Sequence, residues 1–271
     1  MREDVASIAT QAFMNASTAS QLMCTTWHEG RHLTDLPLDC HPRTRAEGYA
    51  VQAKWPGQFG QTVAGWKIAA TSVAGQQHIR VSGPLAGPVF AHRVHADGAA
   101  ISLAANRMRV AECEIVFRLG QILAPRDEQY GRTEVLAAVA SVHPGLEAPD
   151  SRFVDFAQAG EAQLLADCAC TNDMIVGAAV AADERMHGLA RLPVRACVSD
   201  GRELQGSGAN VLGDPVEALV WLVNELGAQG RTLTPGQFVT TGACVAPIPV
   251  EPGDAVSADF GWLGTVHARF T

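Results

Sequence analysis

The 271-residue chain has no long hydrophobic run and no excess of positive charge. No stretch approaches the roughly 18 apolar residues that a membrane-spanning helix needs. Lys and Arg number 20 against 28 Asp and Glu, so the formal charge is −8. An acidic balance disfavours general binding to nucleic acid or to anionic membranes. Residues 1–4 include two acids where a secretory signal is basic, so a signal peptide is not expected. The acidic charge and the lack of a long apolar run together predict a protein without nucleic-acid or membrane partners.

The chain also lacks paired cysteine motifs and a glycine-rich nucleotide loop. Its seven cysteines are scattered and odd in number, which indicates a reduced, cytoplasmic protein rather than a disulfide scaffold. Cys168 and Cys170 have no matching second pair, so a structural zinc site is not expected. No G-x-G-x-x-G follows an expected strand, which disfavours a dinucleotide site.

The apolar fraction of 47% is ample for a sizeable core, and its pattern divides the chain in two. Residues 1–60 are expected to be helical, with helices at 5–23 and 44–54 and a stop at the Trp-Pro-Gly of 55–57. Residues 61–271 form a β-rich part in which short apolar runs alternate with Gly, Pro and Asp turns. Because strands and helices do not alternate regularly, we expect an α+β fold rather than a doubly wound sheet.

Specific elements follow from the same patterns. Helices are expected at 133–142, at 155–160 and at 215–226, the last capped by Asp214 and stopped by Gly227. The expected strands are 63–69, 88–90, 101–103, 111–119, 174–176, 194–199, 238–241, 255–260 and 264–270.

Two glutamates one residue apart, Glu112 and Glu114, interrupt the apolar run of residues 109–119. On a strand they point to the same face, with Cys113 on the other. Carboxylates that close repel and raise each other's pKa unless a cation, a shared proton or open water relieves them. The alternative explanation is an ordinary strand face that is exposed to solvent, where such pairs of glutamates also occur. We interpret this pair as a site for a hard divalent cation, Mg²⁺ or Mn²⁺, which takes oxygen ligands.

Other polar residues stand in unusual settings. Lys67 is central in an apolar segment, where a buried ammonium needs a partner, and near a bound cation and apolar walls its pKa is expected to be lowered. Glu147 follows an expected helix and turn, and Asp167 suits a helix end as well as a catalytic role. The histidines without metal-like mutual spacing are interpreted as structural or surface residues: His78, His92, His95 and His143.

A set of short motifs, in order from about residue 45 to the C-terminus, resembles the hydratase/decarboxylase branch of the fumarylacetoacetate hydrolase superfamily. This branch includes 2-oxopent-4-enoate hydratases and 4-oxalocrotonate decarboxylases. The motifs are Gly65-Trp66-Lys67-Ile68 with Thr71-Ser72, Glu112-x-Glu114, Leu146-Glu147, Ala166-Asp167, Leu212-Gly213-x-Pro215 and Thr241-Gly242.

The resemblance implies a mixed β-roll with an N-terminal helical portion, and a homo-oligomer that associates with a related decarboxylase or hydratase of aromatic catabolism. It implies hydration of a small unsaturated 2-oxo acid through a metal-bound enolate. The alternatives are 4-oxalocrotonate-type decarboxylation, acylpyruvate hydrolysis, or a catalytically inactive partner subunit. The implied site residues are the metal ligands Glu112, Glu114 and Glu147, the catalytic Lys67 and Asp167, and the substrate-binding Thr71, Ser72, Thr241 and Gly242.

The chain departs from the family pattern away from the glutamates. The usual Asp-Asn-Ala-Ser is Asp167-Cys168-Ala169-Cys170, and Asp214 replaces a usual histidine. The loop of residues 81–87 has no acid, so Glu161 and His143 are the candidates for a missing acid or base. The metal platform is therefore expected to be intact, while the groups that contact the distal part of the substrate differ.

Overall fold

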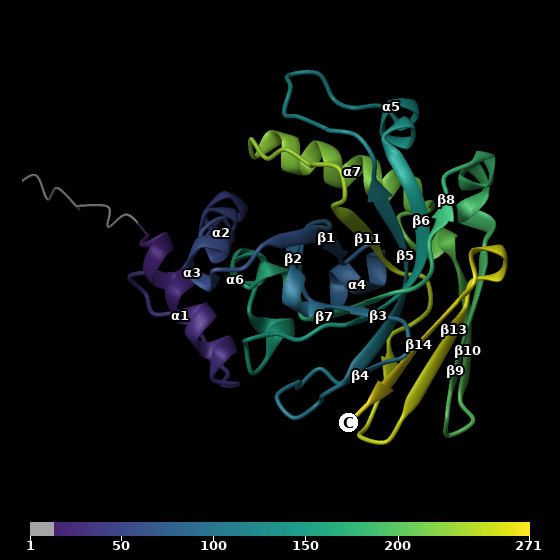
Figure 1. Ribbon diagram of the computed structural model, residues 1–271. Coiled ribbons are helices and arrows are strands. Elements are labelled where there is room, and N and C mark those ends of the chain that lie inside the picture. Colours follow the sequence, from purple (N-terminus) through teal and green to yellow (C-terminus); the bar gives the residue numbers. More distant parts are fainter. Residues whose placement is uncertain (1–13) are drawn as a thin grey trace, which may run out of the picture.

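The computed structural model describes residues 14–271, in which three N-terminal helices lead into a body of two β-sheets (Figure 1). The helices are α1 (Ala16–His28), α2 (Arg45–Gln52) and α3 (Trp55–Phe59). Helix α2 confirms the prediction for 44–54 and begins with a capping box, in which the Thr44 side chain accepts from the Glu47 backbone and the Glu47 side chain accepts from the Thr44 backbone.

The other two N-terminal helices differ from the prediction. Residues 5–13 of the expected first helix lie outside the described residues, and α1 continues past residue 23 to His28. The second helix ends before Trp55, as predicted, but a further helix that was not predicted, α3, begins at that residue. Proline is compatible with the first turn of a helix, whose N–H groups have no partner within the helix.

An aromatic cluster joins the helical region to the body. The ring of Trp27 lies 5.1 Å from that of Phe59, and Trp55 lies 6.2 Å from Phe90. Phe90 belongs to the β-rich body, so the helices and the body share this buried cluster. The end of α3 lies at the predicted boundary near residue 60, and the division into two domains stays a prediction.

The larger sheet has nine strands and mixes parallel and antiparallel pairs. Strands β1 and β11 are parallel, as are β3 and β7, and the other neighbours are antiparallel. The path of neighbours is β2 (Leu85–Phe90), β1 (Val63–Ala69), β11 (Phe238–Ala243), β5 (Val110–Leu119), β6 (Val139–Ala148), β7 (Asp173–Val176) and β3 (Val94–Ala96), with β12 (Ile248–Pro249) beside β5 and β8 (Val180–Ala181) beside β6.

The second sheet has five strands and lies beside the first (Figure 1). Burial alternates along its strand β14, so one face packs on the core and the other meets water. Its order is β10 (Glu203–Ser207), β9 (Pro193–Val198), β13 (Ala255–Asp259), β14 (Thr265–Phe270) and β4 (Ala99–Ile101). The mixed sheets and the N-terminal helices confirm the predicted α+β, mixed β-roll fold.

Short helices connect the strands, and one long helix, α7, contacts β11 of the larger sheet (Figure 1). The body helices are α4 (Val73–His78), α5 (Arg132–Ala137), α6 (Glu161–Ala166) and α7 (Pro215–Ala228). The 3-10 helices are η1 (Ala91–Arg93), η2 (Phe156–Gln158), η3 (Cys168–Cys170), η4 (Glu184–Arg191), η5 (Gly208–Asn210) and η6 (Gly261–Leu263).

The start of α7 confirms the prediction and its end does not. The Asp214 side chain accepts from the Val216 backbone at 2.9 Å, and Pro215 is the first helical residue. Gly227 is not the stop, because the helix includes it and ends one residue later. In the part of the chain that is described, no helix is long and apolar enough to cross a membrane.

The predicted helix at 133–142 is the most consequential error. Helix α5 covers only Arg132–Ala137, and residues from Val139 onward form β6. This strand pairs with β5 on one side and with β7 on the other, and such pairing overrides local helix propensity. Glu147 therefore lies on an internal strand and not after a turn.

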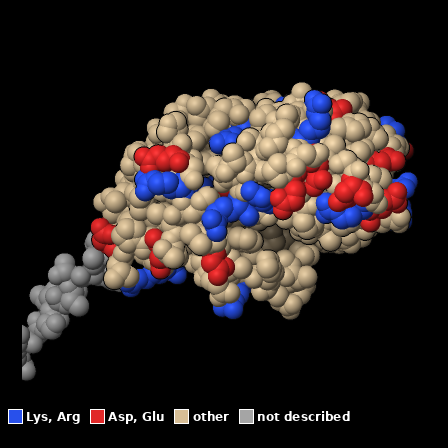
Figure 2. Space-filling view, turned by 90° about the horizontal axis from the view of Figure 1, so that it is seen from below, with Lys and Arg blue, Asp and Glu red and all other residues tan. Residues whose placement is uncertain are grey.

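Smaller differences concern short elements. The helix predicted at 155–160 is the single turn η2, and α4 and α6 were not predicted. The nine predicted strands are present, with ends shifted by up to three residues, while β3, β6, β8, β10 and β12 were missed. On the face in Figure 2, acidic and basic side chains are interspersed.

Candidate active site

Four adjacent strands bring the polar residues of the site together. Lys67 on β1 is the register partner of Thr240 on β11, and Glu112 on β5 is the register partner of Glu147 on β6. Glu114 lies on the same strand as Glu112, two residues further along β5. The prediction that the β5 pair shares one face is thus confirmed by the clustering of their carboxylates. Like charges directly opposite across a ladder are destabilising, which calls for a compensating cation.

The three carboxylates form a compact cluster. One oxygen from each of Glu112, Glu114 and Glu147 lies within 4.8 Å of the others. Glu114 and Glu147 are buried, and Glu112 is half-buried. Glu114 Oε1 and Glu147 Oε2 have no hydrogen-bond partner among residues 14–271. A buried hydrogen-bond acceptor without a partner costs about 1–3 kcal/mol of stability. A hard divalent cation takes oxygen ligands, so it would supply the partner that these two oxygens lack, and the three carboxylates fit such an ion.

The second oxygen of Glu114 is held by strand β11. Glu114 Oε2 accepts a hydrogen bond from Thr240 Oγ1 and another, at 2.8 Å, from the Gly242 backbone. The ladder is irregular between Thr240 and Ala243, and this irregularity turns the N–H of Gly242 toward the carboxylate. Gly242 has φ +104°, and a Cβ there would lie 2.1 Å from Thr71 Oγ1, so the position requires glycine.

Lys67 is buried against the cluster with its ammonium doubly bound. Its Nζ lies 3.0 Å from Glu147 Oε1 and donates to the Ala169 carbonyl at 2.9 Å. Burial alone would lower the pKa of Lys67, but the charges of Glu147 and Glu112 outweigh it and raise that pKa. The predicted lowering assumed a bound cation beside Lys67, so it stays a prediction for the metal-loaded site, whereas the chain's own groups act in the opposite sense.

The carboxylates are perturbed in the opposite sense. Burial and the charge of Glu147 raise the pKa of Glu112 to about 7. Burial and the other two carboxylates raise the pKa of Glu114 well above its ordinary value. Three carboxylates face one ammonium, so the fully ionised cluster has two excess negative charges, which a divalent cation would balance.

The carbonyl that binds Lys67 belongs to an unusual turn. Three consecutive residues of η3, Cys168, Ala169 and Cys170, have φ of 52°, 53° and 60°. The left-handed conformation costs roughly 1–2 kcal/mol per residue without glycine, so other contacts must hold it. Arg152 spans the turn, since it pairs with Asp167 before it and donates from Nη1 to the Thr171 carbonyl after it at 2.7 Å.

Asp167 is committed to this brace. Its carboxylate accepts from Ser151 Oγ at 2.7 Å and binds the Arg152 side chain. Burial raises the pKa of Asp167 to about 6, although Arg152 and Ser151 act against it. Asp167 is not among the described residues that line the main cavity. Its contacts favour a positioning role for the turn, and its catalytic role stays a prediction.

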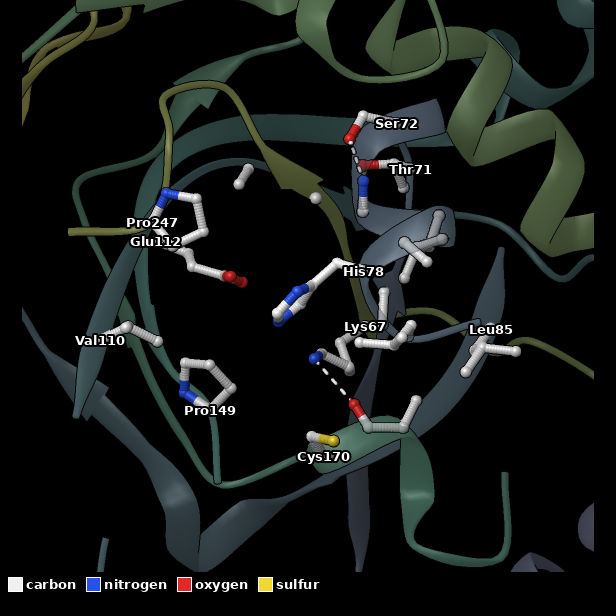
Figure 3. A pocket seen from close by; sticks show the side chains of 18 of the residues that line it. Lys67, Thr71, Ser72, His78, Leu85, Val110, Glu112, Pro149, Cys170 and Pro247 are labelled. Carbon is white, nitrogen blue, oxygen red and sulfur yellow. Dashed lines mark hydrogen bonds between the residues drawn. The ribbon is translucent and has the colours of Figure 1, made fainter. Parts of the chain in front are cut away.

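A cavity of about 620 Å³ opens beside the glutamates. Figure 3 shows Glu112, Lys67 and His78 around it. Thr71, Ser72 and Gly242 also line it, as expected of substrate-binding residues, although that role stays a prediction. Thr241 points elsewhere, because its Oγ1 donates to the Ile115 carbonyl at 2.9 Å. The Ser72 hydroxyl caps α4 by accepting from the Gly75 backbone.

Several residues of the site were not predicted. Thr240 was missed because its contact with Glu114 depends on the pairing of β11 with β5, two strands far apart in the sequence. His78 lines the cavity on α4 together with Ala74, four residues earlier, and its ring lies 5.9 Å from that of Phe156. Cys170 and Asn210 also line the cavity.

The two candidates for a missing acid or base lie elsewhere. Glu161 Oε1 accepts from Arg45 at 2.6 Å, and His143 bonds to Ser141 and to the Gly177 carbonyl, each at 2.9 Å. Among the described residues, neither contributes to the cavity lining.

The fold and the carboxylate cluster define a class of protein. The family model described as fumarylacetoacetate (FAA) hydrolase C-terminal matches residues 67–271, which is most of the chain. The chain therefore belongs to the fumarylacetoacetate hydrolase family. The matched region contains the three glutamates, Lys67 and the β11 segment that supports them.

Within the family, similar proteins include hydratases and decarboxylases. A 2-keto-4-pentenoate hydratase of Paraburkholderia xenovorans (strain LB400) is 33% identical over 214 residues, which are 78% of this chain and 77% of that protein. A 4-oxalocrotonate decarboxylase of Pseudomonas sp. (strain CF600) is 29% identical over 257 residues, 88% of this chain and 94% of that protein. A solved 4-oxalocrotonate decarboxylase from Pseudomonas putida G7, complexed with magnesium and adipate, has a TM-score of 0.84 and 26% identity, covering 94% of this chain and 97% of that one.

Proposed function

We propose that the protein is a metal-dependent hydro-lyase that hydrates a small unsaturated 2-oxo acid of the 2-hydroxypentadienoate/2-oxopent-4-enoate type. The observation that carries the proposal is the cluster of three glutamates beside Lys67, with two buried carboxylate oxygens unpartnered among residues 14–271. The likeness to a 2-keto-4-pentenoate hydratase supports hydration as the reaction.

The cofactor in this proposal is Mg²⁺ or Mn²⁺. Glu112, Glu114 and Glu147 would hold it, and their oxygens are the ligand type that both ions prefer. A bound divalent cation supplies a Lewis acid that stabilises negative charge developing on the 2-oxo oxygen. The magnesium complex of the solved relative supports the choice of metal.

The chain's own groups orient the substrate. Lys67 has three N–H donors, of which one binds Glu147 and one binds the Ala169 carbonyl. Lys67 lines the cavity, so the third donor is available to the substrate carboxylate. A lysine fixed at two points loses little further entropy when it binds substrate, which favours precise placement of the reacting carbons.

The overall reaction adds one water to the substrate. Counted from the dienol, one hydrogen ends on C5, one on C3 and the hydroxyl on C4, while the 2-hydroxyl loses its proton and becomes the 2-oxo group; the carboxylate is unchanged. The largely apolar cavity walls limit the entry of other water molecules to the reacting carbons.

Metal analysis combined with turnover tests the proposal. Wild-type protein should bind about one divalent cation per chain and should consume 2-hydroxypenta-2,4-dienoate. The loss of the ultraviolet absorbance of this dienoate measures its turnover. Glu112→Gln should lose metal and activity together, whereas the exposed control Glu128→Gln should keep both. Absence of metal and of turnover on any 2-oxo acid would overturn the proposal, and binding without turnover would favour an inactive partner subunit.

Decarboxylation is a second candidate, favoured by the structural likeness to 4-oxalocrotonate decarboxylase. The same charge stabilisation at the 2-oxo oxygen would serve the loss of CO₂. Release of CO₂ from 4-oxalocrotonate, with no hydration of the dienol, would assign this reaction instead.

We further propose a cytoplasmic homo-oligomer that associates with a related decarboxylase or hydratase, on the basis of the family resemblance. Each of the seven cysteines is a free thiol, which supports a reducing compartment. Light scattering coupled to gel filtration measures the oligomeric state, and a mass equal to one chain would contradict it.

A further inference from the structure

We infer that the substrate has a single carboxylate, bound at the glutamate end, and an uncharged apolar group at its distal end that is larger than the terminal carbon of pentadienoate. This inference rests on the proposed function and names the substrate class of the same site. It is carried by the size of the cavity and by the placement of charge along its walls.

The cavity is too large for a five-carbon acid alone. At about 620 Å³ it falls within the range of about 300–1,000 Å³ that is typical of pockets for drug-sized ligands. The carboxylate and 2-oxo group of any 2-oxo acid would occupy the end beside Glu112 and Lys67. With a pentadienoate bound there, much of the remaining cavity volume would stay empty or hold water.

The remaining walls are apolar. They come from segments far apart in the sequence: Val110 on β5, Phe156 on η2, Leu164 on α6, and the loop of residues 245–247 after β11. Val110 precedes Glu112 by two residues on the same strand face, so the two residues lie about 7 Å apart along β5, with Val110 on the side away from Glu114. Burial of an apolar substituent against these side chains gains about fourfold in affinity per methylene.

A second carboxylate would have no cationic partner there. Among residues 14–271, the cavity lining has no arginine, and Lys67 is its single lysine. That lysine is bound to Glu147 and to the Ala169 carbonyl at the glutamate end, where its third N–H serves the first carboxylate. A carboxylate without a partner in an apolar wall is strongly disfavoured, so dicarboxylates should bind poorly.

Polar groups on the lining do not change this conclusion. Thr71, Ser72 and Asn210 are neutral, and the Ser72 hydroxyl is occupied as the cap of α4. His78 is the one imidazole on the described lining, and its ring packs against Phe156.

Three synthetic 2-hydroxy-2,4-dienoates test the inference with the metal-loaded enzyme. They carry hydrogen, a propyl group or a carboxyethyl group at C5, so that the last two match in length and differ in charge. We expect kcat/KM for the propyl compound to exceed that of the carboxyethyl compound by at least about tenfold, and to exceed that of the unsubstituted acid. A carboxyethyl compound used as well as the propyl compound, or an unsubstituted acid preferred over it, overturns the inference.

A variant with a new distal cation provides the second arm. Val110→Arg should reduce the preference for propyl over carboxyethyl at least about tenfold, while the neutral control Val110→Met keeps it. If Val110→Arg does not fold, Phe156→Arg with Phe156→Leu serves the same purpose on the half-buried η2 turn. An unchanged ratio in a folded arginine variant overturns the inference. Absence of turnover on all three compounds, by contrast, contradicts the proposed function itself.

Discussion

Replacing Glu112, one of the proposed metal ligands, should stabilise the protein when no metal is present. Glu112 lies directly opposite Glu147 in the β5–β6 ladder, and burial together with the charge of Glu147 raises its pKa from 4.5 to about 7. Glutamine resembles protonated glutamate in shape and carries no charge. We therefore expect Glu112→Gln to remove an electrostatic cost in chelator, although it removes a functional side chain.

The sign and size follow from proton linkage. Between about pH 4.5 and about pH 7 the folded protein holds the Glu112 proton more tightly than the unfolded chain, so rising pH lowers stability across this window. At about 1.4 kcal/mol per pKa unit, the full shift corresponds to about 3 kcal/mol above pH 7. About 1 kcal/mol of this is present at about pH 5.5, and none remains well below 4.5.

Urea denaturation in EDTA at about pH 5.5 and about pH 8 measures the effect. The advantage of Glu112→Gln over wild type should grow by about 2 kcal/mol between these pH values, whereas Glu128→Gln should show no such growth. Excess magnesium should reverse the order at about pH 8, because it binds wild type and not the variant. A variant that is less stable than wild type at about pH 8 in chelator would refute the idea of mutually repelling buried carboxylates.

Three further outcomes follow from single contacts. Thr240→Val should weaken magnesium binding about tenfold in calorimetry, because it removes a hydrogen bond to Glu114, while the neighbouring Thr241→Val should leave affinity unchanged. Lys67→Met should bind magnesium more tightly, since a cation beside the carboxylates is lost, yet lose turnover about 100-fold or more in the dienol assay. Arg152→Met should lower the free energy of unfolding in urea by about 3–5 kcal/mol, because it leaves a buried carboxylate unpaired.

The part of the site that depends on strand periodicity could be predicted from the sequence. The alternation of side chains alone places Glu112 and Glu114 on one face, whichever strands lie beside them. Repulsion between them then predicts a cation without any knowledge of the fold. The third carboxylate was identified only through the family resemblance, because residues 133–142 have a helical pattern and the pairing of β6 with β5 is a tertiary contact.

Contacts between distant segments could not be predicted from the sequence. Thr240 binds Glu114 across 126 residues, and Lys67 binds the Ala169 carbonyl across 102 residues. The left-handed turn of η3 has no glycine, so the sequence gives no local sign of it. The turn depends on Arg152, whose side chain the structure places against both of its ends.

The two ends of the cavity have different structural origins, and this explains how one fold can serve different substrates. The glutamates and Lys67 lie on internal strands, where a change of register would move every neighbouring side chain. Part of the distal wall comes from η2, α6 and the loop of residues 245–247, which can change without disturbing the sheet. Substitutions confined to these segments should therefore alter the choice of substrate while metal affinity stays constant. Variants such as Phe156→Arg test this separation directly, because a simultaneous loss of magnesium binding would show that the two ends are coupled.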